Sequence, residues 1–339
     1  MDELTRVREL RADAPTPDRA RLAPGRTRLL EAARADERHR ALWRRRQFVI
    51  VGGVVAAVTA VAVTVSLLLG GSGGDRKVQP ATTPGVHLKG VSASDLLNRL
   101  ADEVEKQPDA AVPTAKQWIY TKTIEEPVKD PKADQYKNLP KGALKLMTGP
   151  QESWLRYDGT AQAGWNLDTK GEKLKLQVTE MHLENGAEGD DRSPREMYRT
   201  LAALPSTAEG TLKALREQNA IADDKGASQS RNDYAEITVL LRADVMPAKA
   251  LASLYRALAT VPGGKLTDHL VDTGAGRRAI ALTYDRAGST PNGSAMREQW
   301  LIDPQTYRVF GMRLLDGNKI ATGSITVSTS VVNAPGDRG

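Results

Sequence analysis

The 339-residue chain contains no cysteine and only two phenylalanines, and aromatic residues make up 4% of it. The absence of cysteine excludes disulfides, thiolate metal sites, a cysteine nucleophile and a lipid-modified cysteine at a membrane. Because aromatic residues are scarce, any core must be built mainly from leucine, valine, isoleucine and alanine. A domain of more than about 200 residues folds without disulfides, so this composition fits a compartment on either side of a membrane.

Positive charge is concentrated at the N-terminus. Residues 1–47 contain 13 arginines, no lysine and eight acidic residues, which gives this segment a net charge of +5 out of +6 for the whole chain. The rest of the chain is therefore close to neutral. Domains that bind nucleic acid carry a basic patch or stripe, so we expect no nucleic-acid partner for this larger part.

A long uncharged segment follows the arginine-rich N-terminus. No charged residue occurs between Arg46 and Asp75, and Phe48 to Leu69 reads FVIVGGVVAAVTAVAVTVSLLL, 22 residues. A helix of that length extends roughly 33 Å, which is enough to cross the hydrocarbon of a bilayer. Since lipid offers the backbone no hydrogen-bond partners, a helix is the structure that fits. The sequence predicts one transmembrane helix over residues 48–70.

The charges beside this helix predict its orientation. Five arginines stand directly before it, namely Arg38, Arg40, Arg44, Arg45 and Arg46. Only Arg76 and Lys77 follow it closely, so the positive-inside rule places the N-terminus in the cytoplasm. The long N-terminal region and the lack of an A-x-A-like site argue against a cleaved signal peptide. We therefore expect a single-pass protein of the cell membrane, in contact with membrane lipid, whose C-terminal domain is extracytoplasmic.

The cytoplasmic segment, residues 1–47, has one narrow apolar stripe. Leu4, Val7 and Leu10 recur at helical spacing near its start. An isolated helix of about ten residues is marginal in water, so something must cover the stripe if the helix forms. We consider these residues a docking site for a cytoplasmic protein partner. The alternatives are that they lie on anionic lipid of the inner leaflet, or that the segment is a solvated basic anchor.

The part after the membrane helix divides into a flexible tether (71–90), a folded domain (91–333) and a disordered tail (334–339). Within the domain, strand-like runs come first, helical periodicity follows, and strand-like runs return. This order, with hairpin signals between neighbouring strands, predicts an α+β domain with a mostly antiparallel sheet and a block of helices. The first strands are expected at 117–124, 152–158, 163–167 and 174–181. The last are expected at 266–271, 278–284, 298–302, 309–315 and 325–331. Helices are expected from Ser92 or Ser94, from Ser193, from Ser206 or Thr207, around 234–241 and from Pro247.

The sequence contains no recognisable catalytic or metal-binding pattern. Its four histidines are scattered, and no nucleotide-binding loop or serine-hydrolase elbow occurs. Asp272-Thr273-Gly274-Ala275 matches the catalytic loop of retroviral-type aspartic proteases, in which two copies bring two carboxylates together. Only one copy is present here, and a turn between two strands explains it. We expect no catalytic, cofactor-binding or metal site, no cofactor, and a protein that is not an enzyme.

Four parts of the chain resemble an uncharacterised actinobacterial family of single-span membrane proteins. They are the opening MDELTRVRELRADAPTPD, the membrane anchor, the helix pair YRTLAALPSTAEGTLKAL (198–215), and LYRALATVPGGKLTDHLVDTGAGRRAIAL (254–282) followed by EQWLIDPQTYRVFG (298–311). Members of this family are often encoded beside sigma factors of the extracytoplasmic-function type. The resemblance implies an anti-sigma-like or sensor protein by association. The expected sheet with helices on one face also resembles the half-barrel of periplasmic lipoprotein carriers and of their sensor relatives.

Two functions are compatible with these observations. The first is a membrane-anchored regulator or sensor that links an extracytoplasmic domain, with a ligand that the sequence does not identify, to a cytoplasmic partner such as a sigma factor. The second is an extracytoplasmic lipid- or lipoprotein-binding module tethered to the membrane. A large cavity lined by Trp118, Trp154 and aliphatic residues would favour the second.

Overall fold

The structure is a computed structural model that describes residues 88–168, 170–181, 192–218, 223–289 and 295–339. The expected cytoplasmic segment (1–47), the expected membrane helix (48–70) and most of the expected tether lie outside these residues. Within the described ranges, no helix combines the length and the apolar character needed to cross a membrane.

The described residues form an α+β fold, as the order of strand-like and helical runs predicts. The helices are α3 (Ala93–Glu105), α4 (Lys141–Thr148), α5 (Pro194–Ala202), α6 (Ala208–Gln218), α7 (Gln229–Leu240) and α8 (Ala248–Thr260). The strands are β1 (Trp118–Glu126), β2 (Gln151–Arg156), β3 (Ala161–Leu167), β4 (Leu174–Glu180), β5 (Lys265–Leu266), β6 (Val271–Asp272), β7 (Arg278–Ser289), β8 (Ala295–Ile302), β9 (Val309–Asp316) and β10 (Lys319–Val332). A short 3-10 turn, Asp134–Tyr136, precedes α4.

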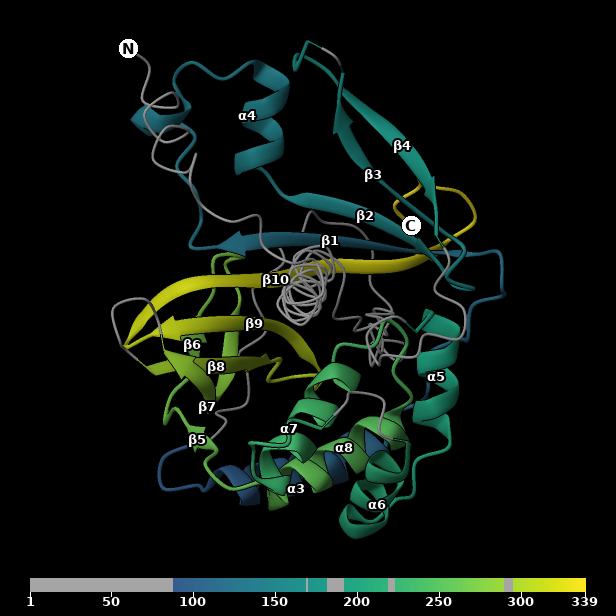
Figure 1. Ribbon diagram of the computed structural model, residues 1–339, viewed down its shortest axis with the longest axis vertical. Helices are drawn as coiled ribbons and strands as arrows, with labels where there is room; N and C mark the ends of the chain where they lie inside the picture. The colour runs from purple at the N-terminus through teal and green to yellow at the C-terminus, as the bar shows by residue number, and fades with distance from the viewer. Residues whose placement is uncertain (1–87, 169, 182–191, 219–222, 290–294) are drawn as a thin grey trace, which may run out of the picture. The chain divides into compact units, whose positions relative to one another are not determined.

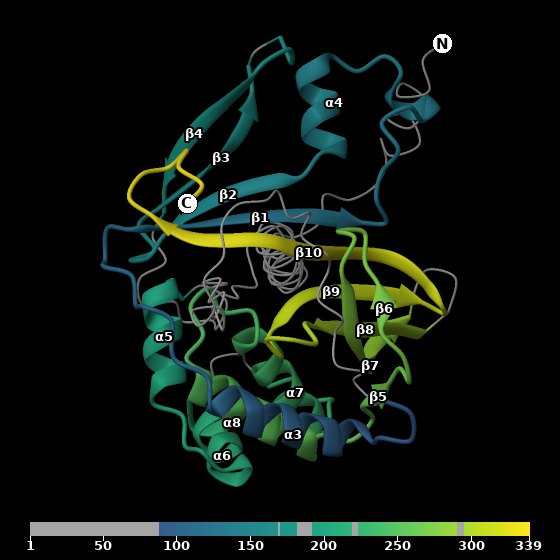
Figure 2. The same ribbon diagram turned by 180° about the vertical axis from the view of Figure 1, so that it is seen from behind.

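These strands belong to one antiparallel sheet in the order β4-β3-β2-β1-β10-β9-β8-β7-β5, with β6 paired to β7. The first and last long strands, β1 and β10, meet in the middle of the sheet, where Trp118 lies opposite Val332. They run side by side in both views (Figure 1, Figure 2). One half of the sheet therefore comes from the strands before the helical block and the other half from the strands after it.

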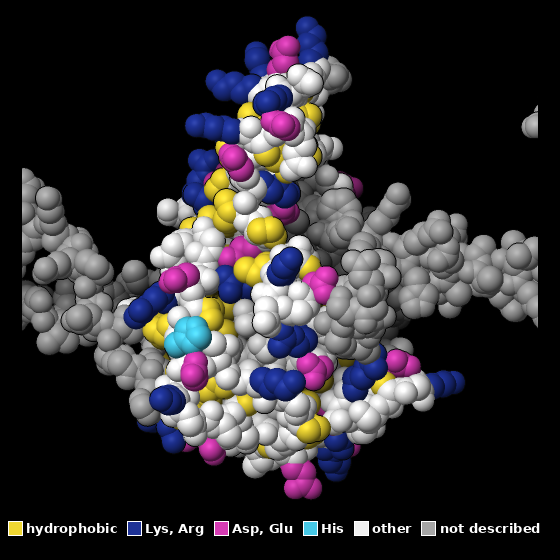
Figure 3. Space-filling view, turned by 90° about the vertical axis from the view of Figure 1, so that its left-hand side faces the viewer, with side chains coloured by type: hydrophobic (Ala, Val, Ile, Leu, Met, Phe, Trp, Pro, Cys, Tyr) yellow, Lys and Arg dark blue, Asp and Glu magenta, His cyan; other side chains and the backbone are white. Residues whose placement is uncertain are grey.

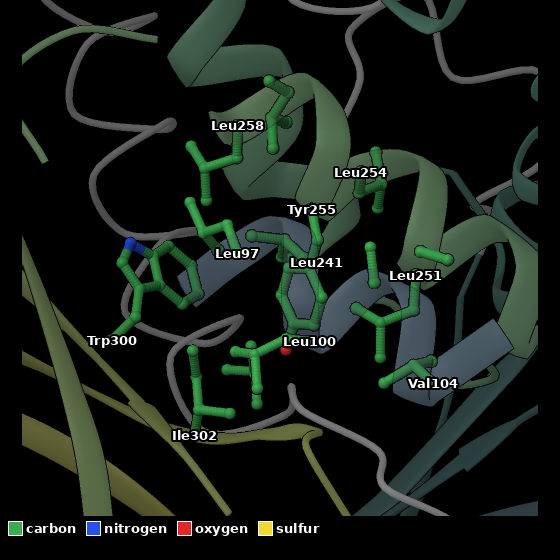
Figure 4. Close-up of a cluster of buried hydrophobic side chains, with 14 of the residues drawn as sticks. Leu97, Leu100, Val104, Leu241, Leu251, Leu254, Tyr255, Leu258, Trp300 and Ile302 are labelled. Atoms are coloured by element: carbon green, nitrogen blue, oxygen red, sulfur yellow. The ribbon is translucent and has the colours of Figure 1, made fainter. Parts of the chain in front are cut away.

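The main hydrophobic core lies between the helices and strands β7, β8 and β9. Figure 4 shows Leu97 of α3, Leu254 of α8 and Trp300 of β8 gathered in this cluster. All three side chains are almost completely buried, and so is Tyr255, whose hydroxyl donates to the carbonyl of Tyr307 over 2.7 Å. Helices α3, α6, α7 and α8 lie together in the lower part of the view in Figure 1. Burial of these aliphatic and aromatic side chains attaches the helical block to one half of the sheet.

Local sequence signals explain where two of the helices begin. The Ser92 hydroxyl accepts a hydrogen bond from the backbone of Asp95 at the start of α3. At α5, Ser193 and Glu196 form a reciprocal capping box, and Pro194 occupies the first helical position. These side chains satisfy backbone N–H groups that have no partner within the helix.

The continuous strand predicted for residues 266–271 is wrong in its middle. Leu266 pairs with Leu282, and Val271 pairs with Ala279. The segment from Leu266 to Val271 therefore has more residues between these two pairs than β7 has. The extra residues cannot all pair, and the exposed Asp268 and His269 lie in a bend between β5 and β6. Three consecutive polar residues, Thr267, Asp268 and His269, in the middle of the run are the physical reason for the break.

Candidate ligand-binding site

Helix α4 forms one wall of a pocket beside the β3–β4 hairpin. The helix follows Pro140, which fixes the backbone just before the first turn, and ends at Gly149-Pro150, which stops it. The side-chain amide of Gln151 donates to the carbonyl of Leu146 over 2.5 Å and so ties the last turn of α4 to the start of β2. The helix is therefore held at the position where the sheet begins.

The other attachment of α4 is a close backbone contact with the β3–β4 turn. The backbone N–H of Ala143 donates to the carbonyl of Gly171 over 3.2 Å. A Cβ atom at Gly142 would lie 2.6 Å from the carbonyl oxygen of Glu172, closer than side chains allow. Glycine at position 142 thus permits the helix to rest on the turn.

A pocket of about 500 Å³ lies between α4, the start of β2 and the β3–β4 hairpin. This volume is in the range of sites that hold small organic molecules. Its lining combines apolar side chains (Leu146, Pro150, Trp165, Leu174) with basic ones (Lys141, Lys145, Lys173, Arg338). At the upper end of the domain, Figure 3 shows several lysine and arginine side chains, with acidic and hydrophobic side chains between them.

One carboxylate in the lining, that of Glu152, has all of its hydrogen-bonding capacity in use. The Arg338 guanidinium donates to its two oxygens over 2.7 and 2.9 Å. The Tyr120 hydroxyl and the Trp165 indole N–H each donate to it over 2.8 Å. The bonds from Arg338, with those from Tyr120 and Trp165, lower the pKa of Glu152 to about 2 against the opposing effect of burial. Glu152 is therefore a neutralised part of the wall.

The C-terminal residues bring Arg338 to this wall. The indole N–H of the fully buried Trp154 donates to the carbonyl of Asp337 over 2.6 Å, and the Ser330 hydroxyl donates to the carbonyl of Arg338 over 2.8 Å. In both ribbon views the C-terminus lies beside β3 and β4. Residues 334–339, for which the sequence predicts a disordered tail, thus contact the sheet and help to line the pocket.

The net charge of the pocket follows from these pairings. The charge of Arg338 is compensated by Glu152. The side-chain ammonium groups of Lys141, Lys145 and Lys173 have no ion-pair or hydrogen-bond partner among the described residues. Glu172 is the remaining acidic group of the lining. The pocket therefore presents an excess of positive charge next to the face of a half-buried tryptophan.

A second, much smaller cavity of about 30 Å³ lies between the α7–α8 loop and strands β1 and β10. Its lining includes Asp244, whose carboxyl has no hydrogen-bond or ion-pair partner among the described residues, and Thr329, whose buried hydroxyl also has none. Burial raises the pKa of Asp244 to about 7. The volume suffices for one water molecule between polar groups, but not for an organic ligand.

The structure gives the Asp272-Thr273-Gly274 loop a set of structural contacts. Glu126 and Arg313 form a buried ion pair at 2.5 Å beneath it. The backbone N–H of Gly274 donates to Glu126 over 2.5 Å, and Arg313 donates to the carbonyl of Asp272 over 2.7 Å. The Asp272 side chain is exposed, while these backbone groups attach the loop to the sheet.

The other residues singled out from the sequence lie mostly outside the described ranges. The docking stripe Leu4, Val7 and Leu10 does so, as do the orienting arginines Arg38, Arg40, Arg44, Arg45 and Arg46. Of the four histidines only His269 is described; it is exposed and lies 2.7 Å from Asp268. Among the described residues no group of three or more histidine, aspartate or glutamate side chains is placed to hold a metal ion.

No pattern in the sequence indicated this pocket. A signal for α4 was present, because Lys141 and Lys145 stand one helical turn apart between Pro140 and Gly149-Pro150. The pairing of Glu152 with Arg338 had no local signal, since 186 positions separate them.

Comparison with known proteins adds no relative. No protein-family model matches the chain, and no curated protein matches it. The chemistry of the site must therefore be inferred from its own residues. The apolar wall and the uncompensated lysines are suited to binding an organic anion.

Proposed function

We propose that the chain is a membrane-anchored, non-enzymatic regulator whose extracytoplasmic domain binds a ligand and whose N-terminal segment contacts a cytoplasmic protein. The observation that carries the ligand-binding part is the pocket of about 500 Å³ with its excess of lysines. Residues 48–70 are the transmembrane anchor, and the arginines before them keep residues 1–47 in the cytoplasm.

A sigma factor is the cytoplasmic partner that we propose. This part is supported by the resemblance to a single-span family encoded beside sigma factors, and by the stripe of Leu4, Val7 and Leu10. The arginines that flank the stripe, Arg6, Arg8 and Arg11, suit an acidic protein surface and would speed association with it.

The second candidate function is a tethered lipid- or lipoprotein-binding module with a half-barrel sheet. The apolar wall of the pocket favours it. Two observations argue against this second function. Trp118 and Trp154, which would line a lipid cavity if this function held, are packed in a core cluster with Tyr120. The sheet face below α3 and α8 is filled by side chains such as Leu254 and Trp300.

Capture of the partner from cells tests the regulator function. The full-length chain, extracted from membranes in mild detergent, should retain a sigma factor. The double variant Leu4→Asp/Leu10→Asp should lose it, because two charges on the stripe prevent its burial. The control Thr5→Asp/Ala12→Asp adds the same charge off the stripe and should retain it. If the unaltered chain retains no sigma factor, while a peptide of residues 1–20 binds anionic vesicles, the segment is a membrane anchor and the regulator function is wrong.

A further inference from the structure

We infer that the pocket beside α4 binds a single-chain anionic amphiphile, with a phosphate or carboxylate head held by lysines and an apolar chain lying against Trp165. This inference rests on the proposed function, since it names the class of ligand that the outer domain would receive. It uses the described pocket alone and does not depend on which cytoplasmic protein is contacted.

The charges of the lining indicate an anionic head. Lys141 and Lys145 lie one turn apart on α4, and Lys173 enters the same pocket from the start of β4. Like charges that share a small pocket repel one another, and a bound anion turns that repulsion into attraction. A cationic head would meet three lysines and one available carboxylate among the described lining residues, that of the exposed Glu172, because the Glu152 carboxylate already accepts four hydrogen bonds.

The apolar part of the lining indicates a hydrocarbon chain or ring behind the head. Leu146, Leu174 and Trp165 present apolar surface within the same pocket and are only partly buried. Covering such surface contributes about 25 cal/mol for each Å² removed from water. A bare inorganic anion would leave this surface wet, so an amphiphile uses both halves of the pocket.

A hydrogen bond and a ring contact fix the indole of Trp165 in place for this contact. Its N–H donates to Glu152, and its ring meets that of Trp154 edge-on with centroids 6.1 Å apart. The ring of Tyr120 also packs on Trp154, with centroids 5.2 Å apart. An indole held in this way loses little conformational entropy when a ligand packs against it.

Binding of hexyl phosphate to the full-length chain in phosphatidylcholine nanodiscs tests the inference. Trp165 is the tryptophan of the described residues that lines the pocket, so its fluorescence reports occupancy. We expect saturable binding that weakens as salt is added, because the head is held by charge. Inorganic phosphate, hexanol and hexyltrimethylammonium should each bind at least about tenfold more weakly.

Matched variants locate the binding. The triple variant Lys141→Gln/Lys145→Gln/Lys173→Gln should weaken hexyl phosphate at least about tenfold. The triple variant Lys116→Gln/Lys225→Gln/Lys249→Gln makes the same change in net charge at exposed lysines away from the pocket and should bind normally. If the first triple variant fails to fold, the single variant Lys173→Glu serves in its place, since Lys173 is exposed.

Two sources of the anion are distinguished by the bilayer. If lipid of the surrounding membrane supplies the ligand, nanodiscs that contain lysophosphatidic acid, a single-chain anionic lipid, should compete with hexyl phosphate. If a soluble amphiphile supplies it, they should not, and either result agrees with the inference. Unchanged affinity in the pocket variant, equal affinity for inorganic phosphate or for the cationic analogue, or no binding of hexyl phosphate would overturn it. These results leave capture of a sigma factor untouched, so failure here and failure of the proposed function are told apart.

Discussion

At the scale of single residues, two carboxyl groups of the domain meet opposite surroundings. Glu152 accepts bonds from Arg338, Tyr120 and Trp165, and its pKa falls to about 2. Asp244 borders a small cavity without a partner in the described part of the chain, and burial raises its pKa to about 7. The two groups therefore make the stability of the domain depend on pH with opposite signs.

Replacing Glu152 with glutamine should remove a loss of stability in acid. A carboxyl whose pKa is lowered in the folded state contributes stability above its unfolded pKa, and this contribution disappears as the pH falls from about 4.5 towards 2. Urea unfolding of residues 88–339 across this window should be flatter for Glu152→Gln than for the unaltered domain, with lower stability at pH 7. The exposed Glu172→Gln is the control and should follow the unaltered domain. If the stability of Glu152→Gln falls in acid as steeply as that of the unaltered domain, the four hydrogen bonds do not lower the pKa of Glu152.

Replacing Asp244 with asparagine should have the opposite effect. Because the folded-state pKa is raised, the contribution of Asp244 to stability is greatest below about pH 4 and is lost as the pH rises to about 7. Asp244→Asn lacks this loss. At pH 8 its free energy of unfolding should exceed that of the unaltered domain by on the order of 2–4 kcal/mol, and the lower value allows for the partial exposure of Asp244. Thermal unfolding at pH 4 and pH 8 measures the difference. Asp223→Asn, at an exposed position, should show none, and equal pH dependence of both variants would refute the assignment.

Truncation of Trp300 measures how much the core under α3 and α8 contributes. The side chain is 1% exposed, and its indole N–H donates to the Tyr234 hydroxyl over 2.9 Å. Trp300→Ala leaves a cavity and removes the hydrogen bond to the Tyr234 hydroxyl, so the free energy of unfolding should fall by roughly 3–5 kcal/mol. Val331→Ala, at a position 42% exposed, should change it by less than about 0.5 kcal/mol. A small loss at Trp300 would mean that the helices are not packed on β8 as described.

At the scale of elements, α4 is the piece that builds the pocket, and its seating depends on one glycine. Alanine favours a helix over glycine by about 1 kcal/mol, which would stabilise α4 alone. At position 142, however, the added methyl group would meet the backbone of Glu172 at 2.6 Å. We expect the contact to outweigh the propensity, so Gly142→Ala should lower stability by about 1–3 kcal/mol and weaken hexyl phosphate binding. In Gly164→Ala the nearest atom is 4.0 Å away, and this control should bind normally. A gain of stability in Gly142→Ala would contradict the close contact.

The elements that the sequence predicts well are those with a strong local signal. Helices α3 and α5 begin at serine caps, α8 begins after Pro247, and strands β1 and β9 alternate or run apolar for eight or nine residues. Helix α4 was not predicted, because its eight residues are too few to show a repeated apolar face. The order of strands in the sheet was beyond prediction as well, since the pairing of Trp118 with Val332 joins residues far apart in the chain. The pocket depends on both of these features.

At the scale of the whole molecule, the described domain carries a pocket, and in the proposed function the residues before it carry the anchor and the docking stripe. The C-terminal residues belong to the domain, because Asp337 and Arg338 contact Trp154 and Glu152. In the proposed function the ligand meets the pocket outside the cytoplasm, while Leu4, Val7 and Leu10 meet a protein inside it. The central claim is therefore that the two ends of the chain lie on opposite sides of a membrane.

A topology assay tests this claim most directly. A reporter enzyme that is active only outside the cytoplasm is fused after Gly339 or after Arg46, and its activity is measured in intact cells. The account predicts activity for the Gly339 fusion and none for the Arg46 fusion. Replacing Arg38, Arg40, Arg44, Arg45 and Arg46 with glutamine should scramble this pattern, since those charges set the orientation. Activity of the Arg46 fusion in the unaltered chain, or none for the Gly339 fusion, would contradict the account.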